Sequence, residues 1–260
     1  MSDPRPHLPP EILDHIIDLL HDNRETLQRC CLVSKSRVPR ARKYLFSHVE
    51  SKSEGYDKWK KTFPDPTNSL ACHVHTLTVD VSLRGVEDSS WICGFFRVER
   101  LIVDCEWAGS NISSISLAPF HRLAASIKAL DVTFTLLSRA QIFDLICSLP
   151  LLEDLTLSGD DLAVDDDESG ELLATIPSTP LALTGTFDLF LCASVGRILR
   201  QLLCLPNGLH FRKLDMSRCR AQDLHRVVEI MAACSGTLEY LKITCQVDSS
   251  LVSPSALTFA

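Results

Sequence analysis

The chain has 260 residues, of which 45% are hydrophobic and 23% are charged, a composition typical of a globular rather than a disordered protein. Its 26 Lys and Arg against 33 Asp and Glu give a net charge of −7, which argues against nucleic acid or an anionic membrane as its main partner. No apolar run reaches the roughly 18 residues of a membrane span, and no signal peptide is predicted. The 11 cysteines include no Cys-x-x-Cys pair, so we expect neither a disulfide framework nor a zinc site. We expect a reducing cytoplasmic or nuclear location.

Charge divides the chain into two parts. Residues 1–62 contain 12 basic and 9 acidic side chains, a net charge of +3, whereas residues 63–260 contain 14 basic and 24 acidic side chains, a net charge of −10. Residues 51–68 include one glycine and two prolines but few aliphatic residues, which indicates a connector. We therefore expect a helical head over residues 1–50 and a larger acidic body over residues 69–260.

The head is predicted to form three helices. Pro10 lies in the first turn of the first helix, where proline is tolerated, and apolar residues at helical spacing continue to Leu20. Asn23 is placed to cap a second helix that continues to Val33. Ser36 is expected to cap the third helix.

The head resembles an F-box in the order and spacing of Leu8-Pro9-Pro10-Glu11-Ile12-Leu13, Ile16, Leu32-Val33-Ser34-Lys35-Ser36, Ala41 and Leu45-Phe46. It is similar to the F-box proteins that mushroom-type (basidiomycete) fungi carry in large numbers, although Arg37 stands where the family often has Trp or Phe. The resemblance implies a surface for the Skp adaptor of cullin-RING ubiquitin ligases. The residues that match the adaptor-binding positions are Leu8, Pro9, Ile12, Ile16, Leu20, Leu32, Val33 and Lys35.

The size of the head supports an outside partner. A unit of about 40 residues cannot bury all of its apolar side chains, and apolar surface that stays exposed marks an interaction site. The alternative is a head that packs its apolar stripe against its own body. The basic residues from Lys35 to Lys43 are interpreted as the solvated face of the third helix rather than as a nuclear targeting signal.

The body contains a repeated hexad in which an apolar residue is followed by Leu three positions later and by a second apolar residue after two more. The central leucines are 24, 29, 25, 59 and 27 residues apart. The gap of 59 equals two periods, so a further strand is predicted between residues 181 and 191, although its register is not defined. Alternation within the hexad predicts a short strand with one buried face. The hexads are Val74/Leu77/Val79, Val98/Leu101/Val103, Ile127/Leu130/Val132, Leu152/Leu155/Leu157, Phe211/Leu214/Met216 and Leu238/Leu241/Ile243.

Helical stretches alternate with these strands, which predicts an α/β fold with a parallel sheet. The period resembles that of leucine-rich repeats, but only Cys219 matches the Asn or Cys that the family places three residues after the hexad. The predicted fold is therefore an N-terminal three-helix F-box followed by an irregular leucine-rich-repeat-like α/β solenoid. The apolar stripes of its helices are Ile142, Leu145, Ile146 and Leu149, then Ile198, Leu199, Leu202 and Leu203, then Leu224, Val227, Val228 and Met231.

Residues that alternate with the buried strand positions are predicted to line the concave face of the solenoid, the face with which such proteins bind partners. Several are Asp, so the expected target is mildly basic. The alternative is a solvated face without a partner, because an exposed strand face is polar in either case. The candidate target-binding residues are Thr78, Asp80, Asp104, Asp131, Thr133, Thr156, Ser158, Asp215, Ser217 and Lys242.

The sequence offers no recognised catalytic, metal or cofactor site. Residues 165–170 begin like a calcium loop, but Ile176 occupies its twelfth position, so a solvated acidic loop is expected. His73 and His75 alternate on a predicted strand without further zinc ligands nearby. Nucleophile-elbow, phosphate-loop and dinucleotide-binding motifs are missing. Cysteines near the apolar positions are expected to pack as small hydrophobes, namely Cys105, Cys147, Cys204, Cys219 and Cys245.

Three functions are weighed on these observations. The favoured one is a substrate-recognition subunit of an SCF-type cullin-RING E3 ubiquitin ligase, which binds the Skp adaptor, and through it cullin, with its head and an unidentified target protein with its body. Such a subunit acts by proximity and needs no catalytic residue. The second is a non-catalytic protein-binding scaffold whose F-box does not engage the cullin machinery. The third, an enzyme of unrecognised type, is disfavoured because no site motif is present.

Overall fold

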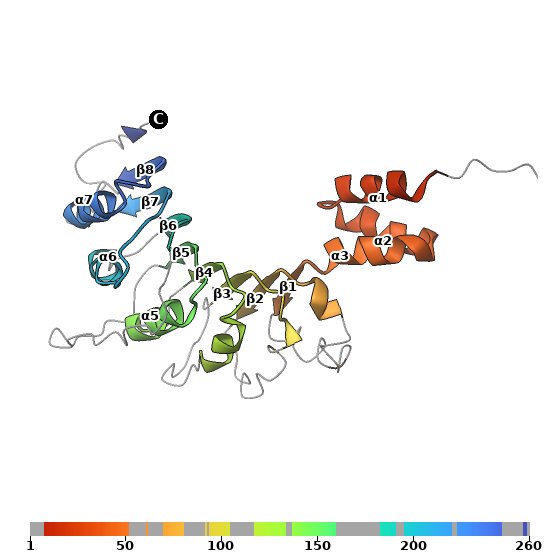
Figure 1. Cartoon of the computed structure of the whole chain (residues 1–260), viewed down its shortest axis with the longest axis horizontal. Coiled ribbons are helices and arrows are strands. Elements are labelled where there is room, and N and C mark those ends of the chain that lie inside the picture. Colours follow the sequence, from red (N-terminus) through yellow and green to blue (C-terminus); the bar gives the residue numbers. More distant parts are fainter. Residues whose placement is uncertain are drawn as a thin grey trace, which may run out of the picture.

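The chain is a mixed α/β protein built around a parallel sheet, as the sequence predicts (Figure 1). The computed structural model describes residues 8–51, 61, 70–80, 92, 94–104, 117–133, 137–159, 183–190, 195–219, 223–245 and 257–258. Three helices form the head, at the right in Figure 1, and the chain passes from the third of them directly into the first strand. The head contains α1 (Pro10–Leu19), α2 (Arg24–Val33), the 3-10 helix η1 (Lys35–Arg37) and α3 (Val38–Leu45).

Local sequence explains where the head helices begin. Pro10 occupies the first position of α1, where a missing N–H leaves no helical hydrogen bond unmade. Asn23 caps α2 as predicted, because its side-chain oxygen accepts a hydrogen bond from the backbone N–H of Thr26 at 3.0 Å. The prediction that Ser36 caps the third helix is wrong. Ser36 lies inside η1, where its hydroxyl is 2.8 Å from that of Ser34, and α3 follows this extra turn.

Nine described strands form one sheet, and their order in space is their order in the chain. The first eight are parallel to their neighbours, and the ninth pairs antiparallel with the eighth. Parallel neighbours need crossover connections rather than tight hairpins. The strands are β1 (His48–Ser51), β2 (Thr76–Asp80), β3 (Arg100–Asp104), β4 (Ala129–Thr133), β5 (Asp154–Ser158), β6 (Thr186–Phe190), β7 (Lys213–Cys219), β8 (Tyr240–Cys245) and β9 (Leu257–Thr258).

The described parts of the crossovers contain η2 (Leu70–His73), η4 (Ala118–Leu123), α5 (Arg139–Ser148), α6 (Val195–Leu203) and α7 (Leu224–Ala233). In Figure 1 the strands follow a curved path from β1 to β8, and α5, α6 and α7 lie on the outer side of the curve. We call the opposite, inner side the free sheet face. Helix α5 begins with a capping box, in which Ser138 and Gln141 exchange side-chain-to-backbone hydrogen bonds.

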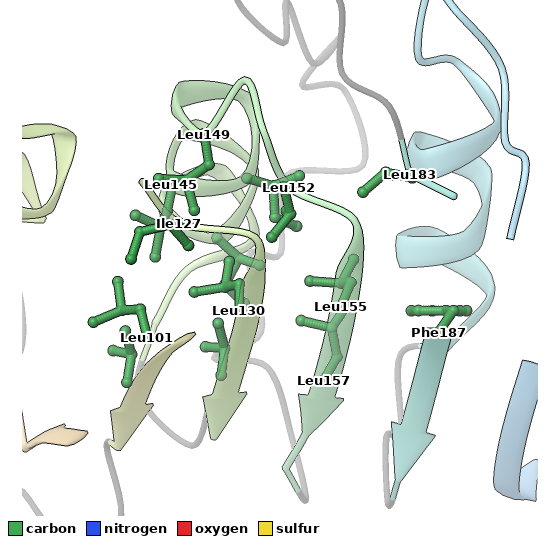
Figure 2. Close-up of a cluster of buried hydrophobic side chains, with 14 of the residues drawn as sticks. Leu101, Ile127, Leu130, Leu145, Leu149, Leu152, Leu155, Leu157, Leu183 and Phe187 are labelled. Atoms are coloured by element: carbon green, nitrogen blue, oxygen red, sulfur yellow. The ribbon is translucent and has the colours of Figure 1, made fainter. Parts of the chain in front are cut away.

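The hydrophobic core lies between the sheet and these helices (Figure 2). Its centre is a row of residues, one from each parallel strand, whose members pair in register. All but the last are buried, and each buried side chain of this size contributes about 1.5–3 kcal/mol. The row is Val49, Leu77, Leu101, Leu130, Leu155, Phe187, Leu214 and the half-buried Leu241.

The strand predicted between residues 181 and 191 is β6, and its central position holds Phe187 instead of leucine. The Phe187 ring stacks on that of Phe211, with ring centroids 5.2 Å apart. Gly185 precedes the strand, and a Cβ at this position would lie 2.1 Å from Oδ1 of Asp154. That oxygen accepts a hydrogen bond from the backbone N–H following Gly185, so a glycine is needed for the close approach of β5 and β6.

The structure also differs from the sequence predictions at the start of the sheet, in α7 and at two cysteines. The sheet begins with β1, within the segment assigned to the head and connector, because Val49 continues the core row. Val228 is exposed because other residues of α7 face the sheet. Cys204 and Cys245 are exposed rather than packed, and Cys105 lies outside the described residues.

Candidate protein-binding surfaces

Helix α1 has apolar side chains on two sides. Ile17 is 2% exposed and faces the other head helices, whereas Ile12 and Ile16 are exposed and Leu19 is 69% exposed. Residues three and four apart share one side of a helix, and Ile12, Ile16 and Leu19 have this spacing. The single broad stripe expected from the sequence is therefore divided into a buried side and an exposed side.

Helix α2 is divided in the same way along its length. Leu27 is 1% exposed, whereas Leu32 and Val33 at the C-terminal end are 87% and 70% exposed. Leu8, just before α1, is also exposed. We call the exposed apolar residues of this region the head surface, which consists of Leu8, Ile12, Ile16, Leu19, Leu32 and Val33.

The structure leaves most of the predicted adaptor-binding residues accessible. Leu20 is the exception, because it is half-buried against the inner core of the head. Leu19 was not selected from the sequence, although its position three residues after Ile16 indicates the same side of the helix. The predicted residues that are exposed are Leu8, Pro9, Ile12, Ile16, Leu32, Val33 and Lys35.

The inner core of the head is small. Helix α3 contacts η2 of the body, whereas the head surface is on and before α1 and at the end of α2. The alternative in which the head covers its apolar stripe with its own body is therefore not what the described residues show. The buried members of the inner core are Ile17, Leu27 and Ala41, whereas six large apolar side chains of the head are exposed.

An ion pair holds α1 on α3. Both carboxylate oxygens of Asp18 accept hydrogen bonds from Arg40, with Nε at 2.6 Å, and the Tyr44 hydroxyl donates to the same carboxylate at 2.7 Å. These hydrogen bonds hold the pKa of Asp18 well below its usual range and raise the pKa of Arg40. Arg40 therefore has a structural partner, unlike the fully solvated basic residue predicted from the sequence.

The free sheet face presents polar residues in rows across the strands. Alternate residues of a strand point to the same face, so the positions between the buried ones all lie here. The middle row is Glu50, Thr78, Ile102, Asp131, Thr156, Asp188, Asp215 and Lys242. The next row contains Asp80, Asp104, Thr133, Ser158, Phe190, Ser217 and Thr244. These two rows bring together all ten predicted target-binding residues, each half-buried.

Several charged residues of the middle row pair within the face itself. Arg100, from the preceding row, donates a hydrogen bond from Nε to Oδ2 of Asp131 at 2.8 Å. Lys242 donates to Oδ2 of Asp215 at 2.7 Å, and the Ser217 hydroxyl donates to Oδ1 of Asp215 at 3.0 Å. Asp131 and Asp215 are therefore held in place and partly neutralised before any partner arrives.

Asp188 differs from these residues, because its carboxylate has no hydrogen-bond or ion-pair partner among the described residues. Burial raises the pKa of Asp188, and the nearby carboxylates of Asp215, Asp131 and Asp154 raise it further. Phe190, two positions later on the same face, is 43% exposed. Asp188 and Phe190 are not among the residues predicted from the sequence, because both alternate with the buried residue of β6, whose register the hexad pattern does not define.

The other residues that the sequence singled out provide less evidence for a functional site. His73 ends η2 and His75 precedes β2, so the prediction that they alternate on one strand is wrong, and burial lowers the pKa of His73. The acidic segment at 165–170 lies outside the described residues. Within the described part of the chain, no group of three or more His, Cys, Asp or Glu could hold a metal ion. In the same ranges, no helix has the length and apolar character to cross a membrane.

Comparison of the chain with protein-family models, with curated proteins and with solved structures gave no match. The interpretation of its surfaces therefore depends on its own residues and geometry. The head surface and the free sheet face are the two features from which a function can be argued.

Proposed function

We propose that this chain is the substrate-recognition subunit of an SCF-type cullin-RING E3 ubiquitin ligase. In this proposal the head is an F-box that binds the Skp adaptor, and through it cullin. The body is an irregular leucine-rich-repeat-like solenoid that binds a target protein. The observation that supports the proposal most is the exposure of the apolar head surface, in the segment whose residues resemble an F-box.

The distribution of exposed apolar side chains favours a protein partner for the head. Six of the eleven large hydrophobic side chains exposed among the described residues belong to the head, a small part of the chain. Large apolar side chains buried at the centre of an interface provide much of its binding energy. A partner that covers the head surface gains about 0.8 kcal/mol for each CH₂ group it buries.

The two surfaces have different chemistry, which suits a subunit with two partners. The head surface is apolar, whereas the free sheet face is polar and contains several carboxylates. The Asp18–Arg40 pair holds α1 on α3 and so keeps the head surface in one arrangement. A subunit of this kind brings a target near a ubiquitin-charged enzyme, and its effect on rate comes from proximity.

Binding of the purified full chain to a purified Skp adaptor tests the proposal. The wild type is expected to be retained by the immobilised adaptor, and a paired Leu8→Ala, Pro9→Ala variant is expected to lose this binding. Val228→Ala is the matched control, because it truncates an apolar residue that is 61% exposed on α7 of the body. If the wild type does not bind, the ligase proposal fails and the non-catalytic scaffold is the better interpretation.

A further inference from the structure

The middle row of the free sheet face contains one carboxylate without a hydrogen-bond or ion-pair partner among the described residues. Asp188 lies in the middle row between Thr156 and Asp215. Asp215 and Asp131 are paired within the face, and Asp154 accepts the backbone hydrogen bond at the start of β6. Asp188 is the acidic residue in this group without such a partner among the described residues.

An exposed aromatic ring accompanies this carboxylate. Phe190 follows Asp188 by two positions on the same strand, so their Cα atoms are about 6.7 Å apart on the same face. The neighbours of Phe190 in its row are Ser158 and Ser217, and Phe190 is partly exposed beside them. An acidic group beside an apolar ring matches a side chain with a cationic end and a hydrocarbon stem.

The charge of the surrounding face has the sign that such a side chain requires. The middle row and the row before it contain the cations Arg100, Lys213 and Lys242 and the carboxylates of Glu50, Asp131, Asp154, Asp188 and Asp215, which sum to −2. Without Asp188 the sum is −1, so this residue supplies half of the net negative charge. A cation at Asp188 relieves its repulsion with neighbouring carboxylates, and the attraction strengthens as binding excludes water.

We propose that the free sheet face binds a segment of a partner protein that places a lysine or arginine side chain on Asp188, with the stem of that side chain against Phe190. The inference rests on the proposed function, because it takes the free sheet face as the target-binding surface. It adds the chemistry of the target, which is a basic residue in an accessible segment.

A displayed library of random peptides, selected on the immobilised full chain, tests this inference. We expect the retained peptides to be enriched in Lys or Arg and to bind more weakly as salt is raised. Asp188→Asn is expected to weaken the best peptides by roughly tenfold or more, because it removes the negative partner of the ion pair. Phe190→Ala is expected to weaken them less, since it removes only the contact with the stem.

Matched variants separate this effect from misfolding. Asp14→Asn changes an exposed carboxylate of α1 and is expected to leave peptide binding unchanged. Asp188→Lys is expected to reject the selected peptides and to bind versions in which their basic residue is replaced by Glu. The inference is overturned if no peptide is retained, if the peptides show no enrichment in Lys or Arg, or if Asp188→Asn binds them as the wild type does.

The adaptor assay distinguishes this inference from the proposed function. Asp188→Asn leaves the head unchanged and is expected to bind the Skp adaptor normally. Adaptor binding without Asp188-dependent peptide binding removes the inference and leaves the proposed function in place. Asp188-dependent peptide binding without adaptor binding removes the proposed ligase function and leaves the inference about the free sheet face in place.

Discussion

Leu27 and Leu32 belong to the same helix, but the structure gives them opposite roles. Leu27 is 1% exposed and packs in the inner core of the head, whereas Leu32 is 87% exposed on the head surface. Truncation of either residue to alanine removes the same three carbon atoms. The pair of variants therefore separates a contribution to folding from a contribution to the proposed adaptor binding.

The expected magnitudes follow from these environments. Leu27→Ala creates a cavity and lowers the free energy of unfolding of the head by about 2–5 kcal/mol, a large share of the stability of a small unit. Leu32→Ala changes that free energy by less than about 0.5 kcal/mol, because the side chain is already exposed. Three carbons at about 0.8 kcal/mol each, scaled by the 87% exposure of Leu32, give about 2.1 kcal/mol of binding, or roughly a 30-fold weaker Kd.

Two measurements check this prediction. Urea unfolding followed by far-ultraviolet circular dichroism gives the stability of each variant in the full chain. Isothermal titration with a purified Skp adaptor gives the Kd of Leu32→Ala, with Val228→Ala as the control for truncation of an exposed apolar residue elsewhere. A loss of stability in Leu32→Ala as large as that in Leu27→Ala would refute the assignment of Leu32 to the surface. An unchanged Kd for Leu32→Ala would remove it from the adaptor-binding residues.

Three further variants test other contacts of the fold. Asp18→Asn is expected to lower the melting temperature of the head at neutral pH. Because hydrogen bonds hold the pKa of Asp18 below its usual value, the wild type keeps their stabilisation above about pH 4 and loses it as the pH falls through the lowered pKa. The melting temperatures of the wild type and of Asp18→Asn, plotted against pH, should therefore converge in acid. A constant difference between them would contradict the ion pair. Gly185→Ala forces a Cβ against Asp154 and is expected to cost about 1–3 kcal/mol in urea unfolding, whereas Gly236→Ala, with no atom within 4 Å of the new Cβ, is expected to have little effect. Asp188→Asn is expected to raise the free energy of unfolding at neutral pH, because the raised pKa of Asp188 means that its ionised form disfavours the folded state. As the pH falls through that raised pKa, the folded wild type takes up a proton and gains stability relative to its unfolded state. The greater free energy of unfolding of the variant should therefore disappear below about pH 4. A difference that stays constant with pH would argue against the burial of this carboxylate.

Much of the sheet was predictable from local pattern. Leu77, Leu101 and Leu130 were expected to be the central residues of consecutive strands, and they pair in register. This succeeded because side chains alternate along a strand, so a short apolar–polar pattern defines the buried face without knowledge of the rest of the chain. The helix cap at Asn23 was predictable for the same reason, since a cap depends on residues three positions apart.

The register of β6 needed the tertiary structure. Phe187 takes the place of the usual leucine, and its identity as the buried residue depends on pairing with β5 and β7 and on stacking against Phe211. Asp188 and Phe190 became visible as surface residues only after that pairing was known. A departure from the repeated residue type hides a strand from pattern analysis even when the neighbouring strands determine its position.

The sequence by itself determined that helices precede the strands of the sheet, and it determined the strand positions of the hexads. Only the tertiary structure decided that Ile17 is buried while Ile16 is exposed, that Asp18 pairs with Arg40 twenty-two positions away, and that Asp188 lies without a partner among paired carboxylates. The physical reason is the range of the interactions. Periodicity and capping act within a few residues along the chain, whereas burial and charge pairing depend on elements that folding brings together from distant positions.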